Sequence, residues 1–217
     1  KQGLVGTSGS TARVLEENLT RMRIQIDRSL SEIRMRADPN IYVEKFHLNV
    51  LVDQILITAQ SEARTKKQIL RNDITAEINL ETDRQLLLSA VSNIIQNALK
   101  YSIVGGHILI TAGVTADNVL IEIQDQCGGI NPEALKNIFK PFTSSGFDQT
   151  GLGLGLTIVQ RAVFLLNGKI SVSNNPGTGC AFLIDIPKKL VPTSPTKLHP
   201  GTDSVQPKTK KGTKSSP

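Results

Sequence analysis

The chain has 217 residues, enough for one domain of ordinary size with appended segments. Its net charge is +6, but residues 188–217 hold seven Lys and one Asp, so residues 1–187, with 18 basic and 18 acidic residues, are neutral. A neutral main part argues against nucleic-acid binding, which needs a basic face on the binding domain itself.

No apolar run approaches the roughly 18 residues of a membrane-spanning helix. Two cysteines are too few for a disulfide framework and fit a reducing compartment. We therefore expect this segment to be cytoplasmic. The chain begins with Lys1 rather than Met, so we interpret it as part of a longer protein, which elsewhere can be attached to a membrane.

Residues 1–40 predict a loop followed by a helix over residues 11–36. The apolar residues of this helix are spaced 4-3-4-4-3 and form one narrow stripe: Leu15, Leu19, Met22, Ile26, Leu30 and Ile33. So narrow a stripe is typical of a helix that packs on a partner helix, so we expect a homodimer through this segment. Packing of the helix on its own domain is the alternative.

Residues 41–187 predict one domain of helices and strands. Helical periodicity predicts a helix within residues 46–63, after a short extended piece, and further helices over residues 82–101, 132–138 and 154–166. Alternation predicts a strand region over 69–80, marked by Ile74, Ala76 and Ile78, and strands over 107–112, 119–124, 169–173 and 181–186. This order favours a two-layer α/β sandwich with a mixed, mostly antiparallel sheet. Residues 188–217, rich in Pro, Lys, Thr and Ser, predict a disordered basic tail.

The helix over residues 82–101 carries an unusual row of polar side chains. Its apolar face is Leu87, Val91, Ile94 and Ala98, and its expected solvent face is Ser89, Ser92 and Gln96. A third line of side chains holds Asn93, Asn97, Lys100 and Tyr101. Such a row can offer amide oxygens to a cation, a positive charge to phosphate and a ring to a flat base. A merely polar helix border is the alternative.

Two glycine-rich motifs follow. Asp125 ends a predicted strand and precedes Gly128 and Gly129, so its carboxylate can accept a hydrogen bond from an exocyclic amine while a flat ligand lies against the backbone. Residues 151–156 (GLGLGL) immediately precede a helix, where free N–H groups favour an anion. The spacing fits neither a Walker A loop nor a dinucleotide fingerprint. Residues 139–150 between the two motifs are typical of a lid.

Together these motifs resemble those of the histidine-kinase-type ATPases. Residues 93–102 (NIIQNALKYS) look like the N box, 125–130 (DQCGGI) like the first glycine box, 139–142 (FKPF) like the phenylalanine box and 151–156 like the second glycine box. Residues 176–187 (PGTGCAFLIDIP) are similar to the closing hairpin of the family. The resemblance covers about residues 46–187 and implies a Bergerat-type fold. The helix over 11–36 resembles the second dimerisation-domain helix of sensor histidine kinases.

The resemblance implies a site for ATP and Mg²⁺, with Asn93, Asn97 and Lys100 as catalytic residues. Asn97 would bind Mg²⁺, Asn93 would support the metal and phosphate geometry, and Lys100 would contact phosphate. Tyr101 would cover the adenine, and Asp125 would accept from its amino group. The other implied cofactor-binding residues are Gly128, Gly129, Ile130, Gly151, Leu152, Gly153, Leu154, Gly155, Leu156 and Cys180.

The sequence departs from the family pattern in two ways. Cys127 replaces the first glycine of its box and Cys180 replaces the usual Thr of the hairpin. We interpret both as small buried residues, with a redox switch as the alternative. None of His47, His107 and His199 lies on a helix beside an acidic residue, so we expect the phospho-acceptor histidine outside this chain segment.

The resemblance implies transfer of the γ-phosphate of Mg·ATP to that histidine, and then to an aspartate of a response regulator receiver domain. An ATPase or protein serine kinase of the same fold is the first alternative. ATP-hydrolysing relatives place Glu one turn before the metal-binding Asn, as a base for water, whereas Asn93 cannot accept a proton at neutral pH. A scaffold that does not bind nucleotide is the second alternative.

Overall fold

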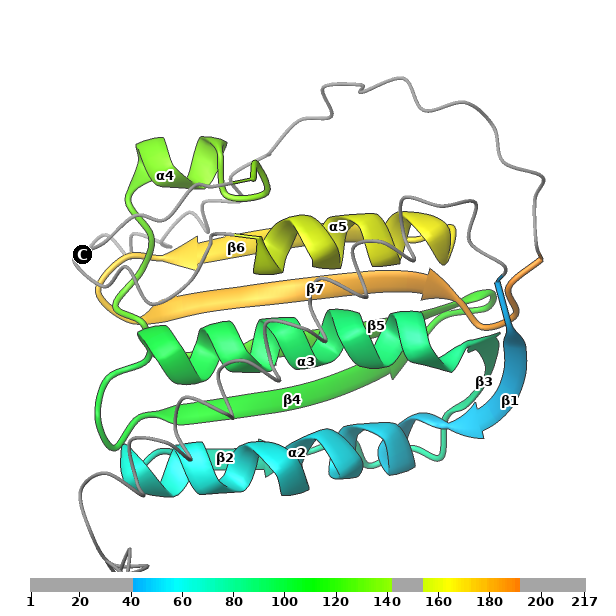
Figure 1. Ribbon diagram of the computed structural model, residues 1–217, viewed down its shortest axis with the longest axis horizontal. Helices are drawn as coiled ribbons and strands as arrows, with labels where there is room; N and C mark the ends of the chain where they lie inside the picture. The colour runs from blue at the N-terminus through cyan, green and yellow to red at the C-terminus, as the bar shows by residue number, and fades with distance from the viewer. Residues whose placement is uncertain (1–40, 142–153, 192–217) are drawn as a thin grey trace, which may run out of the picture. The chain divides into compact units, whose positions relative to one another are not determined.

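The computed structural model describes residues 41–141 and 154–191 (Figure 1). Contacts between residues divide the chain after Asn40, and every described residue belongs to the second unit. The predicted helix over 11–36, the lid residues from Phe142 onward and the tail beyond Val191 lie outside the described residues.

The described domain has two layers (Figure 1). One is a five-stranded sheet in the order β2-β4-β5-β7-β6, in which β2 and β4 are parallel and the other neighbours are antiparallel. Helices α2, α3 and α5 cover one face of it. The strands are β2 Ile69–Asn72, β4 His107–Val114, β5 Asn118–Gln124, β6 Lys169–Asn175 and β7 Gly179–Pro187; the helices are α2 Leu48–Thr65, α3 Arg84–Tyr101, α4 Pro132–Lys136 and α5 Gly155–Leu165. The predicted α/β sandwich with a mixed sheet is confirmed.

A second, two-stranded antiparallel sheet pairs β1 (Val43–His47) with β3 (Asn79–Asp83) at one end of the domain. The prediction of one strand region over residues 69–80 is therefore wrong, because β2 and β3 belong to different sheets. Ile74 and Ile78 are buried in the connection between them, whereas Ala76 is exposed. The alternation that resembled a strand therefore came from two buried isoleucines in a loop, Ile74 and Ile78.

Helix α3 begins at Arg84 because Asp83 caps it. Asp83 Oδ1 accepts hydrogen bonds from the backbone N–H groups of Gln85 and Leu86, both at 3.0 Å, which satisfies two of the free donors at a helix start. Asp83 Oδ2 accepts from the backbone N–H of Tyr42 at 2.9 Å. One carboxylate therefore fixes both the start of α3 and the entry of the chain into the domain.

The predicted apolar face of α3 is confirmed, since Leu87, Val91, Ile94 and Ala98 are almost completely buried. The expected solvent face is not fully exposed: Ser89, Ser92 and Gln96 are half-buried. The reason is the position of α3 between α2 and α5 (Figure 1). Neighbouring helices cover both flanks of α3, so little of it is left for water.

The ordered chain continues beyond Pro187, where we expected a tail. The backbone N–H of Glu81 in β3 donates to Lys188 O at 2.8 Å, and Leu190 N–H donates to Glu81 O at 2.7 Å. Leu190 is only 2% exposed. Residues 188–190 therefore add to the edge of the small sheet, and the expected start of the tail at residue 188 is too early.

Candidate nucleotide site

The two asparagines of α3 lie beside the first residue of α5. Asn93 is 9% exposed, and its Nδ2 donates to Ser89 O at 2.8 Å, so its Oδ1 faces away from that bond. A Cβ on Gly155 would lie 3.3 Å from Asn93 Oδ1 and 3.7 Å from each amide atom of Asn97. The glycine thus leaves space above two carboxamide oxygens, the kind of hard ligand that Mg²⁺ accepts.

The start of α5 points toward the same region. Leu154 precedes the helix with a helical backbone and provides no side-chain cap. The unpaired N–H groups and the dipole of such a helix start favour an anion. Gly155 thus lies close to the asparagine pair, with Leu154 and Leu156 as its neighbours in sequence, while Gly151, Leu152 and Gly153 lie outside the described residues.

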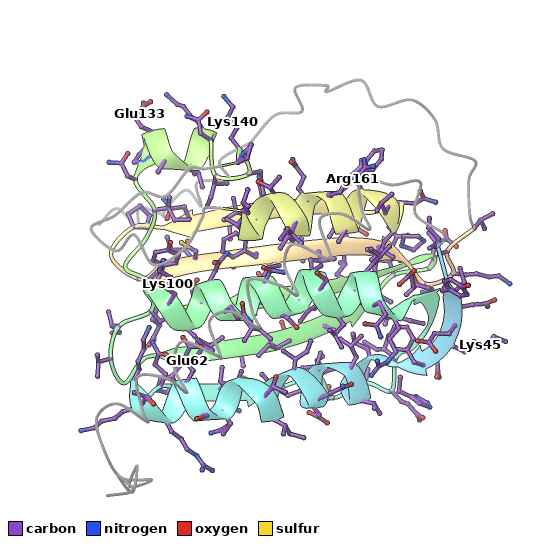
Figure 2. All side chains as sticks on the ribbon, in the orientation of Figure 1. Lys45, Glu62, Lys100, Glu133, Lys140 and Arg161 are labelled. Carbon is purple, nitrogen blue, oxygen red and sulfur yellow. The ribbon has the colours of Figure 1, made fainter. Side chains whose placement is uncertain are left out.

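The last two residues of α3 are Lys100, labelled in Figure 2, and Tyr101. Lys100 Nζ lies 5.1 Å from the centre of the Tyr101 ring, whose side chain is 47% exposed. Residues that sequence reasoning missed hold this helix end. Lys66 Nζ donates to Leu99 O at 2.7 Å and Lys100 O at 3.2 Å, which places a cation at the negative end of the helix.

Gln68 is the second missed residue at this helix end. It is 4% exposed, and its Nε2 donates to Leu99 O at 3.2 Å, Ser102 O at 3.0 Å and Ile103 O at 3.2 Å. The last carbonyls of a helix have no partner within the helix. Gln68 and Lys66 supply those partners and so fix the position of Lys100 and Tyr101.

Asp125 lies where β5 ends and β7 begins. It is 8% exposed, and its Oδ1 accepts from the backbone N–H of Cys127 at 3.0 Å and of Cys180 at 3.2 Å. Both bonds end on Oδ1, which leaves Oδ2 for another donor among the described residues or on a ligand. The predicted acceptor is thus buried, oriented and able to take one more hydrogen bond.

The glycine box after Asp125 has a backbone that requires glycine at two positions. Gly128 and Gly129 have φ values of +79° and +98°. Residues other than glycine rarely adopt this region of backbone conformation. A further residue that sequence reasoning missed, Asn174 of β6, clamps Ile130: Ile130 N–H donates to Asn174 Oδ1 and Asn174 Nδ2 donates to Ile130 O, both at 2.8 Å. The clamp fixes the far end of the box.

Two more contacts bring the end of α3 to the glycine box. The backbone N–H of Gln126 donates to Ser102 Oγ at 3.3 Å, and Ile103 N–H donates to Gln126 O at 3.2 Å. These contacts join the residues that follow α3 to the Asp125 box, and Figure 1 shows α3 ending, β5 ending and α5 beginning on the same side of the domain.

Residues 82–190 match the family described as "Histidine kinase-, DNA gyrase B-, and HSP90-like ATPase". The chain belongs to this family. The match begins just before α3 and ends at Leu190, so it contains the asparagine pair, Asp125 and both glycine motifs.

The chain is similar to a sensor protein and to the catalytic domain of a histidine kinase. The chain is 33% identical over 142 residues to the alginate biosynthesis sensor protein KinB of Pseudomonas aeruginosa, an alignment that covers 63% of this chain and 24% of KinB. The chain thus corresponds to about a quarter of that protein. It is also similar to the catalytic domain of the histidine kinase ThkA, with a TM-score of 0.62 and 26% identity over 68% of this chain and 97% of that domain.

A further solved structure, full-length ShkA in complex with AMPPNP, gives a TM-score of 0.73 at 22% identity over 88% of this chain and 41% of ShkA. ThkA in complex with the response regulator protein TrrA gives 0.62 at 21% identity over 87% of this chain and 53% of that chain. At these identities the likeness concerns the fold. The described domain has the Bergerat-like fold of a histidine kinase catalytic domain.

The family's first glycine box and closing hairpin meet here through two cysteines. Cys127 Sγ and Cys180 Sγ lie 2.9 Å apart; Cys180 is buried, as expected, and Cys127 is half-buried. The hydrogen bond with Cys180 lowers the pKa of the Cys127 thiol, while burial and the Asp125 carboxylate oppose this lowering. The same bond, together with burial, raises the pKa of Cys180 well above its ordinary value. The two thiols therefore differ, and Cys127 is the one that loses its proton more readily.

No helix among the described residues is long and apolar enough to cross a membrane.

Proposed function

We propose that the chain is the ATP-binding catalytic part of a sensor histidine kinase. It would transfer the γ-phosphate of Mg·ATP to a histidine outside this segment, from which a response regulator aspartate receives it. The observation that carries the proposal is the convergence of Asn93, Asn97 and Gly155 with the Asp125 glycine box at one end of the domain. Phosphoryl transfer needs mainly positioning and charge neutralisation.

Each side chain has a role that its position supports. Asp125 Oδ2 would accept from the adenine amino group, the backbone of Gly128, Gly129 and Ile130 would lie against the base, and Tyr101 would cover it. Cys180 would line the adenine site beside Asp125, with which it shares a backbone hydrogen bond.

The phosphate end would be built from α3 and α5. Asn97 would hold Mg²⁺ through its amide oxygen, Asn93 would orient that site, and Lys100 would contact phosphate. The cation would neutralise charge on the phosphates. Gly155, together with Gly151 and Gly153, would present backbone N–H groups to the phosphate oxygens.

Asn93 also distinguishes a kinase from an ATPase. Its Nδ2 is committed to Ser89 O, and an amide cannot take a proton from water at neutral pH. Transfer to a histidine nitrogen needs no such base. We therefore expect slow release of phosphate from Mg·ATP, and rapid release would support the ATPase alternative instead.

The partners belong to the same proposal. The ShkA structure contains AMPPNP and the ThkA structure contains a response regulator, which supports a nucleotide and a receiver domain as partners of this chain. A homodimer through residues 11–36 stays a prediction from the apolar stripe, and so does a cytoplasmic location.

Calorimetric titration of the chain with Mg·ATP tests the nucleotide site. We expect Asp125→Asn to abolish measurable binding, because an amide N–H in place of the acceptor meets the adenine amine. Asp117→Asn is the matched control, since Asp117 is exposed at the opposite end of β5 and should leave affinity unchanged. Asn97→Ala should remove the Mg²⁺ dependence, whereas Gln85→Ala on the exposed first turn of α3 should not.

No binding by the unaltered chain would contradict the kinase proposal and favour the scaffold alternative.

A further inference from the structure

Cys127 and Cys180 form a pair of free thiols whose chemistry the proposed phosphoryl transfer does not use. Cys127 lies in the loop after β5 and Cys180 is the second residue of β7, so 53 residues separate them in sequence. Their sulfur atoms are nevertheless 2.9 Å apart. These are also the two cysteines of the whole chain.

The distance favours a covalent bond over a metal ion. A disulfide has an S–S length of about 2.05 Å, so closure needs the sulfurs to approach by less than 1 Å from the 2.9 Å of the structure. Two thiolates on a tetrahedral zinc ion lie about 3.7 Å apart, so a metal would have to spread them. Asp125 is the third residue of this group of possible ligands, so the described residues offer three ligands where a structural zinc site takes four.

We propose that Cys127 and Cys180 form a peroxide-reactive dithiol that closes reversibly to a disulfide beside Asp125. The two sulfurs differ in access, because Cys127 is half-buried whereas Cys180 is 2% exposed. Cys127 therefore meets the oxidant first and Cys180 resolves the product. The lowering of the pKa of the Cys127 thiol by its hydrogen bond with Cys180 supports this order.

The chemistry balances with hydrogen peroxide as the oxidant. The Cys127 sulfur attacks one peroxide oxygen, the O–O bond breaks, and the departing hydroxide takes up a proton to become water. Cys180 Sγ then attacks Cys127 Sγ of the sulfenic acid, the S–O bond breaks, and the second hydroxide leaves with the proton of the Cys180 thiol as water. Two thiols lose two electrons, and peroxide gains them. A dithiol reductant reverses the reaction by exchange and itself becomes a disulfide.

The bond would join two residues that both donate to Asp125 Oδ1. Its formation would therefore link the glycine box to the start of β7 at the proposed adenine acceptor. The effect on nucleotide binding rests on the proposed function, whereas the reaction of the thiols does not.

The test uses the whole chain and hydrogen peroxide at one equivalent. Unreacted thiols are alkylated, and intact mass and peptide mapping follow. We expect loss of two hydrogen atoms per chain, a peptide in which Cys127 and Cys180 are joined, and return of both thiols with dithiothreitol. Retention of both thiols, or disulfides between chains instead of within one, would overturn the proposal.

Two variants test the order of the reaction. Cys180→Ser should stop at a sulfenic acid on Cys127, which dimedone captures, and Cys127→Ser should leave Cys180 as a thiol at the same dose. Peroxide consumption by Cys127→Ser at the rate of the unaltered chain would contradict the assigned order. A stoichiometric zinc ion in the purified chain that protects both thiols would replace the disulfide by a metal site. Titration with Mg·ATP, measured separately on the reduced chain, keeps this outcome apart from that of the proposed function.

Discussion

Gly179 shows how closely two strands approach at the site. A Cβ at this position would lie 1.9 Å from Asp125 O, a separation that no pair of unbonded atoms tolerates. Glycine here lets the start of β7 lie directly against the residue that presents the proposed adenine acceptor. Gly129 has a similar role against Pro176 Cα, at 3.0 Å. The position of Asp125 therefore depends on one glycine of its own box, Gly129, and on one glycine of the closing hairpin, Gly179.

We predict that Gly179→Ala lowers the free energy of unfolding by about 1–3 kcal/mol, because the backbone must shift to accept the methyl group. The matched control is Gly113→Ala in β4, where an added Cβ meets nothing within 4 Å. Chemical denaturation of both variants measures the difference. Equal stability of the two variants would contradict the close approach.

At the scale of elements, the site depends on how α3 ends. Helix propensity alone would let this end fray, since its last carbonyls lack partners within the helix. Lys66 and Gln68, in the turn between α2 and β2, supply those partners. The connection of a neighbouring helix to the sheet edge therefore sets where Lys100 and Tyr101 lie.

We predict that Gln68→Leu costs about 1–3 kcal/mol of stability, because the buried Ser102 O loses its donor from Gln68 and Leu99 O and Ile103 O each lose one of two donors. Gln85→Leu, on the exposed first turn of α3, should change stability by no more than about 0.5 kcal/mol. Thermal unfolding of both variants provides the comparison. A result in which Gln85→Leu is the more damaging change would contradict the assigned role.

Local patterns predicted most of the elements, and the structure explains where they failed. The Asn93 and Asn97 row and the Asp125 box depend on spacing within one segment, so the sequence revealed them. Asn174 was missed because its partner Ile130 lies 44 residues away. The resemblance implied that Cys127 and Cys180 line one pocket, but it did not predict that their sulfur atoms lie 2.9 Å apart. The strand region over 69–80 was wrong because alternation does not tell a strand from a loop with buried anchors.

At the scale of the whole domain, β3 receives both ends of the described chain. Val43 in β1 pairs with Asp83, and Leu190 bonds to Glu81, two residues away on the same strand. The burial of Leu190 closes this end of the domain. The fold is therefore completed by residues beyond its last strand.

We predict that a chain ending at Pro187 is less stable by about 1.5–3 kcal/mol than a chain ending at Val191, because it exposes the surface that Leu190 covers. The chain ending at Val191 should match the full chain, which makes it the control. Urea denaturation of the three chains measures this. No difference between the two truncations would show that residues 188–191 contribute nothing.

Because both ends of the described domain lie at β3, the order of its elements along the chain can be changed by circular permutation. A short linker from Val191 to Ile41 would close the backbone into a ring, which allows circular permutants with new termini in an exposed turn such as the one around Ala116. Strand β7 runs from the Asp125 end to the β3 end over nine residues, about 30 Å. A fluorophore attached at Val191, just beyond β7, would therefore stand about a strand's length from Asp125.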